Sequence, residues 1–384
     1  MFIQIINTII ENIRHNSNKI CLVASDYTLS YQDFGKRCQA IYDVIVNNSS
    51  KVIAIYGHKE KDTIASMFAC VLANKSYVFI DTTLREERLL YVTNELEISV
   101  ILNTSGSQLS SLFDSVEIID TTLLKDNAFS KNSFLILNLE DIFYYIYTSG
   151  TTGKPKGIQI TYNNFNAFML AYDDVAEIDG ENVAHINHSL FSFDMSMIDI
   201  WFFMGKGMSL ILLHKKYNAL LHKNIEFLRD VQEKYNIYSC FLTPVFISAL
   251  CQSEYFNTKY FPNLKQFYIG GDAWTKSTYN AVKKNFLDGK IWNIYGPSET
   301  TCITHCCLLS DSNISTILPI GKAMGDNVIK IKNESFEDCH TNTIEEVVIY
   351  GSQVSIGYTK LELNSAFLDT TPRGYKTGDL GYLD

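Results

Sequence analysis

The sequence lacks several features that would assign it to other classes of protein. Positive charge is in deficit: 32 Lys and Arg residues stand against 42 Asp and Glu residues, and the formal net charge of -10 argues against a nucleic-acid partner. The longest apolar run, at 198–204, contains Asp199 and is soon followed by Lys206, so we expect no membrane span. No internal repeat with a period of about 20 to 50 residues and no low-complexity tract is present, which sets aside solenoids and propellers.

Two further absences concern the cellular compartment. The nine cysteines include no CxxC pair, and residues 1–13 lack the basic region of a secretory signal. Polar residues interrupt the apolar residues of this first segment, as in an amphipathic helix. We therefore expect a first helix here, reduced thiols and a cytoplasmic location.

The 384 residues contain enough apolar material, 46% against 19% charged residues, for large buried sheets. Apolar strand-like runs alternate with helical stretches, which is the βαβ rhythm of a covered parallel sheet. Clear examples are the strand 52–56, the helix 61–72 and the strands 77–80, 100–102, 209–213, 240–242 and 266–269. Beyond about residue 300 the pattern changes to short strands, at 328–331 and 345–350, separated by polar turns. This change predicts a small β-rich subdomain.

The most informative stretch, residues 147–158, is a loop of hydroxyls, glycines and lysines between apolar strands at 142–147 and 157–161. Glycines allow close backbone approach, and hydroxyl and ammonium groups bind phosphate oxygens. The residues concerned are Thr148, Ser149, Gly150, Thr151, Thr152, Gly153, Lys154 and Lys156. The loop is not a Walker A motif, because Lys154 is followed by Pro155 rather than Ser or Thr. Clusters of this composition are otherwise solvated turns, but the whole string favours a triphosphate-binding loop.

Three strings occur in order along the chain, at 147–158, 293–300 (Asn-Ile-Tyr-Gly-Pro-Ser-Glu-Thr) and 375–380, with a shorter match at 77–81. Together they resemble the landmarks of the adenylate-forming enzymes, the superfamily of acyl-CoA synthetases, luciferases and amino-acid adenylation domains. The resemblance implies an α/β fold with two covered, mainly parallel sheets in an αβαβα layering, plus a barrel-like β-rich subdomain. Family members continue beyond this point into a hinge and a small C-terminal domain with a catalytic lysine. We therefore interpret the chain as the N-terminal core, with two interleaved α/β subdomains at 1–300 and the β-rich subdomain at 301–384.

The same resemblance implies an ATP site. The loop 148–156 would hold the β- and γ-phosphates, with Lys156 as a catalytic cation, and Glu299 would bind Mg²⁺, which prefers oxygen ligands. Thr300 would reach the α-phosphate. The nucleoside would be held by Tyr295 against adenine, Asn293 at the adenine edge, the Gly271 backbone beside adenine and Asp379 on the ribose hydroxyls.

The string Phe193-Asp194-Met195-Ser196 resembles the segment that contacts the substrate's α-ammonium in amino-acid adenylation domains and D-alanine ligases. An ammonium entering an apolar pocket needs an opposite charge, which Asp194 would supply. By the same resemblance the pocket walls are Met195, Ile198, Leu242, Tyr268, Gly270, Ile294, Cys302 and Ile303. They contain no second charge, which favours a neutral substrate side chain. Gly270 stands where D-alanine ligases would have a cysteine, so a deeper pocket for a large hydrophobic or aromatic side chain is expected unless Tyr268 fills the space.

The sequence thus predicts an ATP- and Mg²⁺-dependent ligase that forms an aminoacyl-adenylate for transfer to the phosphopantetheine thiol of a carrier protein. One alternative is an acyl- or aryl-CoA ligase, whose pocket would have to tolerate an unpaired Asp194. The other is a module that binds ATP and an amino acid with little catalytic output, because the lysine of the small domain lies outside these residues.

Overall fold

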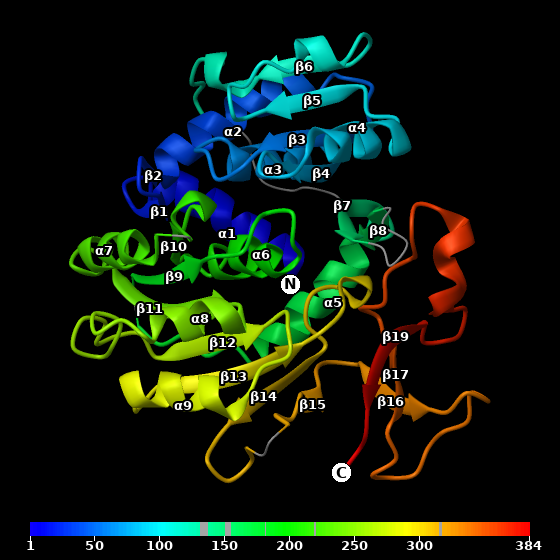
Figure 1. Ribbon diagram of the computed structural model, residues 1–384. Coiled ribbons are helices and arrows are strands. Elements are labelled where there is room, and N and C mark those ends of the chain that lie inside the picture. Colours follow the sequence, from blue (N-terminus) through cyan, green and yellow to red (C-terminus); the bar gives the residue numbers. More distant parts are fainter. Residues whose placement is uncertain (131–136, 150–154, 181, 219, 315–316) are drawn as a thin grey trace.

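The computed structural model describes residues 1–130, 137–149, 155–180, 182–218, 220–314 and 317–384. Figure 1 shows three sheets in these residues, and the first has six strands in the order β6-β5-β3-β4-β7-β8. Neighbouring strands are parallel except β8, which returns antiparallel to β7. The strands are β3 (Val52–Gly57), β4 (Ser76–Asp81), β5 (Val100–Asn103), β6 (Glu117–Asp120), β7 (Ile142–Ser149) and β8 (Pro155–Thr161).

The second sheet has nine strands in the order β15-β14-β13-β12-β11-β9-β10-β1-β2. It is parallel from β13 to β1 and antiparallel at both ends. Its strands are β1 (Ile20–Val23), β2 (Thr28–Ser30), β9 (Val183–Asn187), β10 (Ser209–Leu212), β11 (Asn236–Leu242), β12 (Gln266–Gly270), β13 (Lys290–Tyr295), β14 (His305–Leu309) and β15 (Lys322–Ala323). The two mainly parallel sheets expected from the sequence are therefore confirmed.

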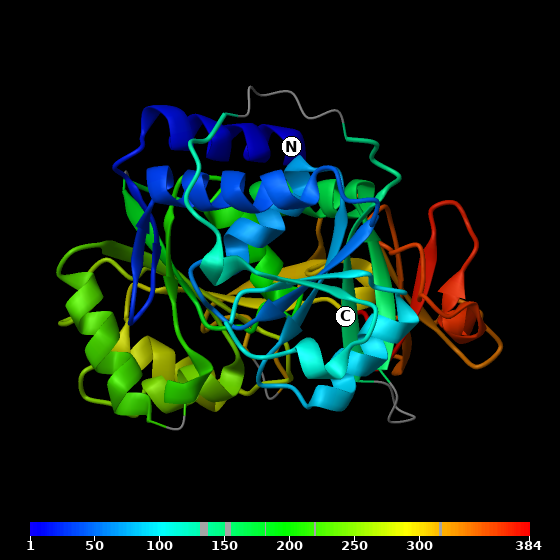
Figure 2. The ribbon, with the colours of Figure 1, turned by 90° about the horizontal axis from the view of Figure 1, so that it is seen from above.

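The third sheet is small and antiparallel, with the order β16-β17-β19-β18, and lies to one side of the larger two (Figures 1 and 2). Its strands are β16 (Val328–Lys332), β17 (Glu345–Tyr350), β18 (Phe367–Leu368) and β19 (Gly374–Gly381). The predicted division at residue 300 does not coincide with its start. Strands β14 and β15 hydrogen-bond onward from β13, so the change of sheet comes at Val328. The assignment of residues 1–300 and 301–384 to separate domains remains a prediction.

Helices cover the sheets in layers. Between the two large sheets lie α1 (Phe2–His15), α2 (Tyr31–Ile45), α3 (Thr63–Leu72) and α5 (Tyr162–Asp173), which share one apolar core with both sheets. Helix α4 (Glu86–Glu95) packs on the other face of the six-stranded sheet. The outer face of the nine-stranded sheet is covered by α7 (Leu221–Gln232), α8 (Pro244–Leu250) and α9 (Lys276–Asn285). This is the expected αβαβα layering.

Local sequence explains these helices. All ten residues of α3 are buried, as expected for a helix that is apolar on every side and lies inside the protein. Helix α2 begins after Ser30, whose side chain accepts a hydrogen bond from the Asp33 backbone, and Thr161 and Asn164 form a capping box at α5. No helix in the described ranges is both long and apolar enough to cross a lipid bilayer.

The short helix α6 (Met195–Met197) continues into η3 (Ile198–Phe203), a π-helical segment in the central layer. Such segments are frequent at functional sites. The remaining short helices are of the 3-10 type: η1 (Ser110–Leu112), η2 (Thr121–Leu123), η4 (Lys215–Tyr217), η5 (Ser298–Thr300) and η6 (Leu361–Ala366).

Candidate active site

The predicted phosphate loop connects two paired strands. Thr148 and Ser149 end β7, and they pair with Lys156 and Pro155 at the start of β8. The ladder fixes both ends of the loop, so the strands extend closer to its centre than the sequence indicated. Of the predicted phosphate-binding residues, Gly150, Thr151, Thr152, Gly153 and Lys154 lie outside the described residues.

Lys156 and Glu299 contact the same tyrosine. The ammonium of Lys156 lies over the ring of Tyr358, 5.2 Å from its centroid. The hydroxyl of Tyr358 donates a hydrogen bond of 2.7 Å to Glu299 Oε1 and lies 3.3 Å from the hydroxyl of Tyr375. Burial raises the pKa of the Tyr358 hydroxyl, and the charge of Glu299 raises it further, so the hydroxyl stays protonated. The structure thus brings the predicted phosphate lysine and metal ligand together.

Glu299 fits a Mg²⁺ ion that is shared with a nucleotide. It lies in η5 with 9% of its surface exposed, and its backbone carbonyl accepts a hydrogen bond from the Ser355 backbone. Within the described ranges, no group of three or more His, Cys, Asp and Glu side chains could hold a metal by itself. Mg²⁺ commonly binds through one or two carboxylates together with substrate phosphates and water. A single buried carboxylate that shares a tyrosine with the predicted phosphate lysine is compatible with that pattern.

Two of the predicted nucleoside residues contact each other. The hydroxyl of Tyr295, at the end of β13, donates a hydrogen bond of 2.6 Å to Asp379 in β19. Desolvation raises the pKa of this hydroxyl, and the neighbouring carboxylate of Asp379 adds to the increase. The predicted adenine and ribose residues therefore lie at one place, although they are far apart in the sequence.

Asn293 and Thr300 make contacts that the sequence did not predict. The Asn293 amide donates to the Pro319 carbonyl at 2.8 Å and accepts from the indole of Trp274 at 2.7 Å. The Thr300 hydroxyl donates to the Pro297 carbonyl at 2.9 Å and is fully buried. In this structure both side chains hold the backbone of the site. Their direct contacts to adenine and to the α-phosphate remain predictions.

Asp194 is buried and incompletely paired. Asp194 is 7% exposed, and its Oδ2 has no hydrogen-bond partner among the residues that the structure describes. Burial raises the pKa of this carboxyl to about 6, although hydrogen bonding from Ser298 and the Met195 backbone partly opposes the increase. Glu299 lies close enough to raise it slightly further. A buried oxygen without a donor is costly, and a cationic or hydrogen-bonding ligand would supply the partner.

Most of the predicted pocket walls lie in one apolar cluster near Asp194. Its members include Met195, Ile198, Tyr268, Ile294, Cys302 and Ile303. The Cys302 thiol contacts the Asp194 carbonyl at 3.4 Å, and a Cβ on Gly271 (φ +87°) would lie 2.8 Å from the Met195 sulfur. Leu242 is an exception, since it belongs to the cluster on the opposite face of the nine-stranded sheet. Alternation along β11 explains this: Phe241 pairs beside Tyr268, and the next residue points the other way.

The prediction of a pocket deepened at Gly270 is wrong. A Cβ at this position would lie 2.4 Å from the Ile294 carbonyl oxygen and 2.5 Å from Ile294 Cγ1. The space left by the missing side chain is therefore filled by the neighbouring strand. Tyr268 is 1% exposed and packs between Tyr172 and Trp292. Glycine here permits close strand approach and adds no room for a substrate.

A strained turn joins the metal side of the site to the pocket wall. Thr301 and Cys302 have φ values of 56° and 65°, a left-handed conformation that is uncommon for residues other than glycine. Buried Gln353 holds the turn. Its side-chain amide donates to the carbonyls of Thr301 at 3.1 Å and Ile303 at 2.8 Å, and its backbone carbonyl accepts a hydrogen bond from the Thr301 hydroxyl. No local sequence pattern marked Gln353, because its role depends on a contact 50 residues away.

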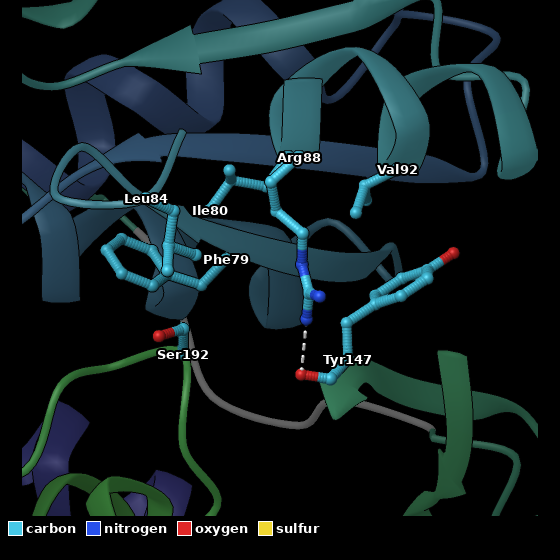
Figure 3. A pocket seen from close by; sticks show the side chains of 7 residues that line it. All are labelled: Phe79, Ile80, Leu84, Arg88, Val92, Tyr147 and Ser192. Carbon is cyan, nitrogen blue, oxygen red and sulfur yellow. Dashed lines mark hydrogen bonds between the residues drawn. The ribbon is translucent and has the colours of Figure 1, made fainter. Parts of the chain in front are cut away.

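Helix α4 contacts the two strands that flank the predicted phosphate loop, on the outer face of the six-stranded sheet. Arg88 donates a hydrogen bond of 2.7 Å to the Tyr147 carbonyl, and both residues line one pocket (Figure 3). The hydroxyl of Tyr91 donates to the Pro155 carbonyl at 3.1 Å, and the Tyr147 hydroxyl donates to Glu95 at 3.0 Å. These three helix residues are spaced to share one face. The spacing was visible in the sequence, but the partner was not.

Lys59 holds the strand that leads to Asp194. It is 4% exposed, and its ammonium donates to the Asn187 side chain at 2.6 Å and to the Leu213 carbonyl at 2.9 Å. Burial lowers the pKa of this lysine to about 7. Sequence reasoning missed Lys59 because one lysine in a loop carries no signal of burial.

Two layered, mainly parallel sheets, with Lys156 and Glu299 on one tyrosine and Tyr295 paired with Asp379, agree with the adenylate-forming ligase expected from the sequence. The chain belongs to the AMP-binding enzyme family, whose sequence profile matches residues 10–359.

Relatives of known function are similar over most of the chain. The D-alanine--D-alanyl carrier protein ligase of Bacillus licheniformis is 26% identical over 388 residues, which cover 99% of this chain and 76% of the relative. The enzyme of the same name from Staphylococcus epidermidis is 26% identical, with 98% and 75% covered.

Two solved structures share the fold. The N-terminal subdomain of Klebsiella oxytoca NpsA, in complex with 3-hydroxybenzoyl-AMSN, superposes with a TM-score of 0.80 at 17% identity, covering 100% of this chain and 96% of that one. The four-domain nonribosomal peptide synthetase holo-AB3403, bound to AMP and glycine, gives 0.81 at 21% identity, covering 99% and 28%. At these identities the similarity establishes the architecture.

Proposed function

We propose that this protein activates a small neutral amino acid with ATP and Mg²⁺, forming an aminoacyl-adenylate that is then passed to a carrier protein. In the first step a carboxylate oxygen of the amino acid bonds to the α-phosphorus, and the bond from that phosphorus to the pyrophosphate oxygen breaks. In the second, the phosphopantetheine thiol of the carrier bonds to the acyl carbon, AMP leaves and the thiol proton is released. The carrier partner rests on the relatives' names.

The unpaired oxygen of Asp194 carries the proposal. A buried carboxylate without a partner is costly, and the α-ammonium of an amino acid would supply both a charge and a hydrogen-bond donor. A fatty or aryl acid has no such group. The acyl- or aryl-CoA ligase alternative would leave Asp194 unpaired in the substrate complex as well, so we favour an amino acid.

The packing around Gly270 supports a small side chain. Ile294 fills the space beside Gly270, and Met195 lies against Gly271. None of the predicted wall residues, from Met195 to Ile303, carries a charge, and Asp194 is the acid among the predicted substrate residues. A neutral substrate of about the size of alanine or glycine fits these walls better than the large hydrophobic or aromatic one that the sequence suggested.

The phosphate side supplies positioning and charge. Lys156 would neutralise phosphate oxygens, and the paired ends of β7 and β8 would hold the loop at a fixed distance from Glu299. Glu299 would hold Mg²⁺, which neutralises negative charge on the phosphates. Tyr295 and Asp379 would hold the nucleoside. The cytoplasmic location remains a prediction.

Pyrophosphate exchange tests the reaction directly. The protein is incubated with ATP, labelled pyrophosphate and, in turn, each proteinogenic amino acid, D-alanine, and several aryl and fatty acids. We expect exchange to be greatest with a small neutral amino acid. Faster exchange with an aryl or fatty acid than with every amino acid would support the alternative ligase.

Calorimetry separates binding from turnover. We expect Lys156→Ala and Glu299→Gln to weaken the binding of ATP in the presence of Mg²⁺. Tight binding with no exchange for any acid would favour a module with little catalytic output. Unaltered affinity in both variants would contradict the assigned nucleotide site.

A further inference from the structure

Tyr358 occupies a position that the proposed reaction does not yet explain. It is 2% exposed, and its ring packs edge-on against Phe367, with centroids 5.2 Å apart. Two of its contacts involve the catalytic candidates themselves: the hydroxyl donates to Glu299 at 2.7 Å, and the ring face carries the Lys156 ammonium. The hydroxyl also lies 3.3 Å from that of Tyr375. One phenol therefore contacts the proposed metal ligand and the proposed phosphate lysine.

The backbone around Tyr358 connects the same two regions. We call residues 355–359 the strap. The Thr359 backbone N–H donates to the Gly157 carbonyl at 2.7 Å, and the Gln159 N–H donates to the Gly357 carbonyl at 3.0 Å, so the strap pairs with β8. At its other end the Ser355 N–H donates to the Glu299 carbonyl at 2.9 Å. The strap thus joins the strand of Lys156 to the turn of Glu299.

We propose that Tyr358 is a positioning residue that orients the Glu299 carboxylate for Mg²⁺ and fixes its distance from Lys156. The proposal rests on the function above. A carboxylate has two oxygens, and the hydrogen bond to Oε1 restricts rotation of the group and leaves Oε2 for a cation. Hydrogen-bond partners behind a metal ligand set its orientation, and their loss typically weakens metal affinity or activity about 10- to 100-fold. The Tyr358 ring holds the Lys156 ammonium in place but does not neutralise its positive charge.

The variant Tyr358→Phe removes the hydroxyl and keeps the ring. We expect the Mg²⁺ concentration for half-maximal pyrophosphate exchange to rise by about tenfold or more, while KM for the amino acid changes by less than about twofold. A second measurement does not depend on turnover. Mn²⁺ binding to the protein with a non-hydrolysable ATP analogue, followed by electron paramagnetic resonance, should weaken by a similar factor.

Tyr279→Phe is the matched control. Tyr279 in α9 is 1% exposed, and its hydroxyl donates to the Asp311 carboxylate at 3.2 Å, on the outer layer of the protein. This variant loses the same type of bond, so both metal measurements should stay at the wild-type value. Thermal melts of the two variants verify that each is folded at the assay temperature.

A double variant, with Tyr358→Phe added to Glu299→Gln, tests whether Tyr358 acts through Glu299. If Tyr358 acts through Glu299, adding Tyr358→Phe to that background should cause no further loss of Mn²⁺ binding. Unchanged Mg²⁺ requirement and unchanged Mn²⁺ affinity in Tyr358→Phe would overturn the proposal. If wild-type protein shows no exchange with any acid, the proposed function fails, and the Mn²⁺ measurement still decides the role of Tyr358.

Discussion

The two halves of the site differ in how their acidic groups are satisfied. On the nucleotide side, Glu299 accepts a hydrogen bond from Tyr358, and Asp379 accepts one from Tyr295. On the substrate side, Asp194 is buried with one oxygen unpartnered. In the proposed function, the nucleotide half would be preorganised by the protein, whereas the substrate half would be completed by its ligand. Specificity would then depend on Asp194, and charge stabilisation on the other half.

A second buried acid shows that burial by itself does not leave a carboxylate oxygen without a hydrogen-bond partner. Asp199 lies five residues beyond Asp194 and is fully buried, but His185 contacts one of its oxygens at 2.8 Å and Asn187 donates to the other at 2.6 Å. The protein can satisfy a buried carboxylate when its role is structural. The contrast with Asp199 is the reason why we propose a ligand at the open oxygen of Asp194.

Asp194→Asn should have the largest effect. Removing one partner of a buried pair costs about 3–5 kcal/mol, so kcat/KM for the amino acid in pyrophosphate exchange should fall about 10²- to 10⁴-fold. KM for ATP should stay within about threefold. An equal fall in kcat/KM for ATP, or an unchanged kcat/KM for the amino acid, would contradict the distinction between the two halves of the site.

The dependence of kcat/KM on pH in the wild-type protein tests the same role of Asp194. Only ionised Asp194 pairs with an ammonium, and its pKa is raised to about 6. We therefore expect kcat/KM for the amino acid to rise with pH up to about 6 and to level off above it. The rise attributable to this group should be absent in Asp194→Asn.

The stability of Asp194→Asn and Asp199→Asn should change in opposite directions. The pKa of Asp194 is higher in the folded state than its ordinary value of 3.8, so ionisation above about pH 6 opposes folding. That shift corresponds to on the order of 3 kcal/mol, and because the amide is also buried we expect Asp194→Asn to gain about 1 kcal/mol near pH 7.5. Asp199→Asn should lose about 1–3 kcal/mol. Urea unfolding measures both, and destabilisation by both would contradict the unpaired state of Asp194.

Ile294→Ala tests what limits the pocket. Ile294 fills the space beside Gly270, so truncation should shift preference toward a larger amino acid by roughly tenfold in the ratio of kcat/KM values. Leu242→Ala is the control, since Leu242 packs on the opposite face of the sheet. Leu242→Ala should lower the free energy of unfolding without changing which amino acid is preferred. A changed preference in Leu242→Ala would restore Leu242 to the pocket.

Tyr295→Phe should have the smallest effect. It removes the hydrogen bond to Asp379 but keeps the ring that would lie against adenine. Because Asp379 is exposed, KM for ATP should rise only about two- to fivefold. Tyr295→Ala should cause a larger increase. Equal values for the two variants would mean that the ring does not contact the nucleotide.

Much of the architecture was predictable because it depends on local pattern. The strands 52–56, 77–80, 266–269 and 345–350 were expected from apolar runs, and each lies within a strand of the structure. Asp194, Glu299 and Tyr295 were expected from strings that resemble a family, and the structure buries or pairs each of them as a site would require.

The predictions for Gly270 and Leu242 failed because packing decides what surrounds these positions, whereas those for Asn293 and Thr300 remain predictions. The sequence suggested extra space at Gly270, but a glycine is equally compatible with an empty space and with a close neighbouring strand. Leu242 was placed in the pocket, but a side chain at the end of a strand can point to either face, and the alternation with Phe241 turned it away. The hydrogen bonds of Asn293 and Thr300 come from residues or carbonyls that no motif specifies.

The sequence by itself determined the periodicity of strands and helices, the phosphate-loop composition and the acidic residue of the substrate segment. These depend on residue type and short-range spacing, which a linear chain records directly. Only the tertiary structure decided which acid lacks a partner, how much space lies beside Gly270 and that Tyr358 contacts both Glu299 and Lys156. Such properties arise from contacts between different elements of the chain, where many pairings are compatible with the same local sequence and packing selects one.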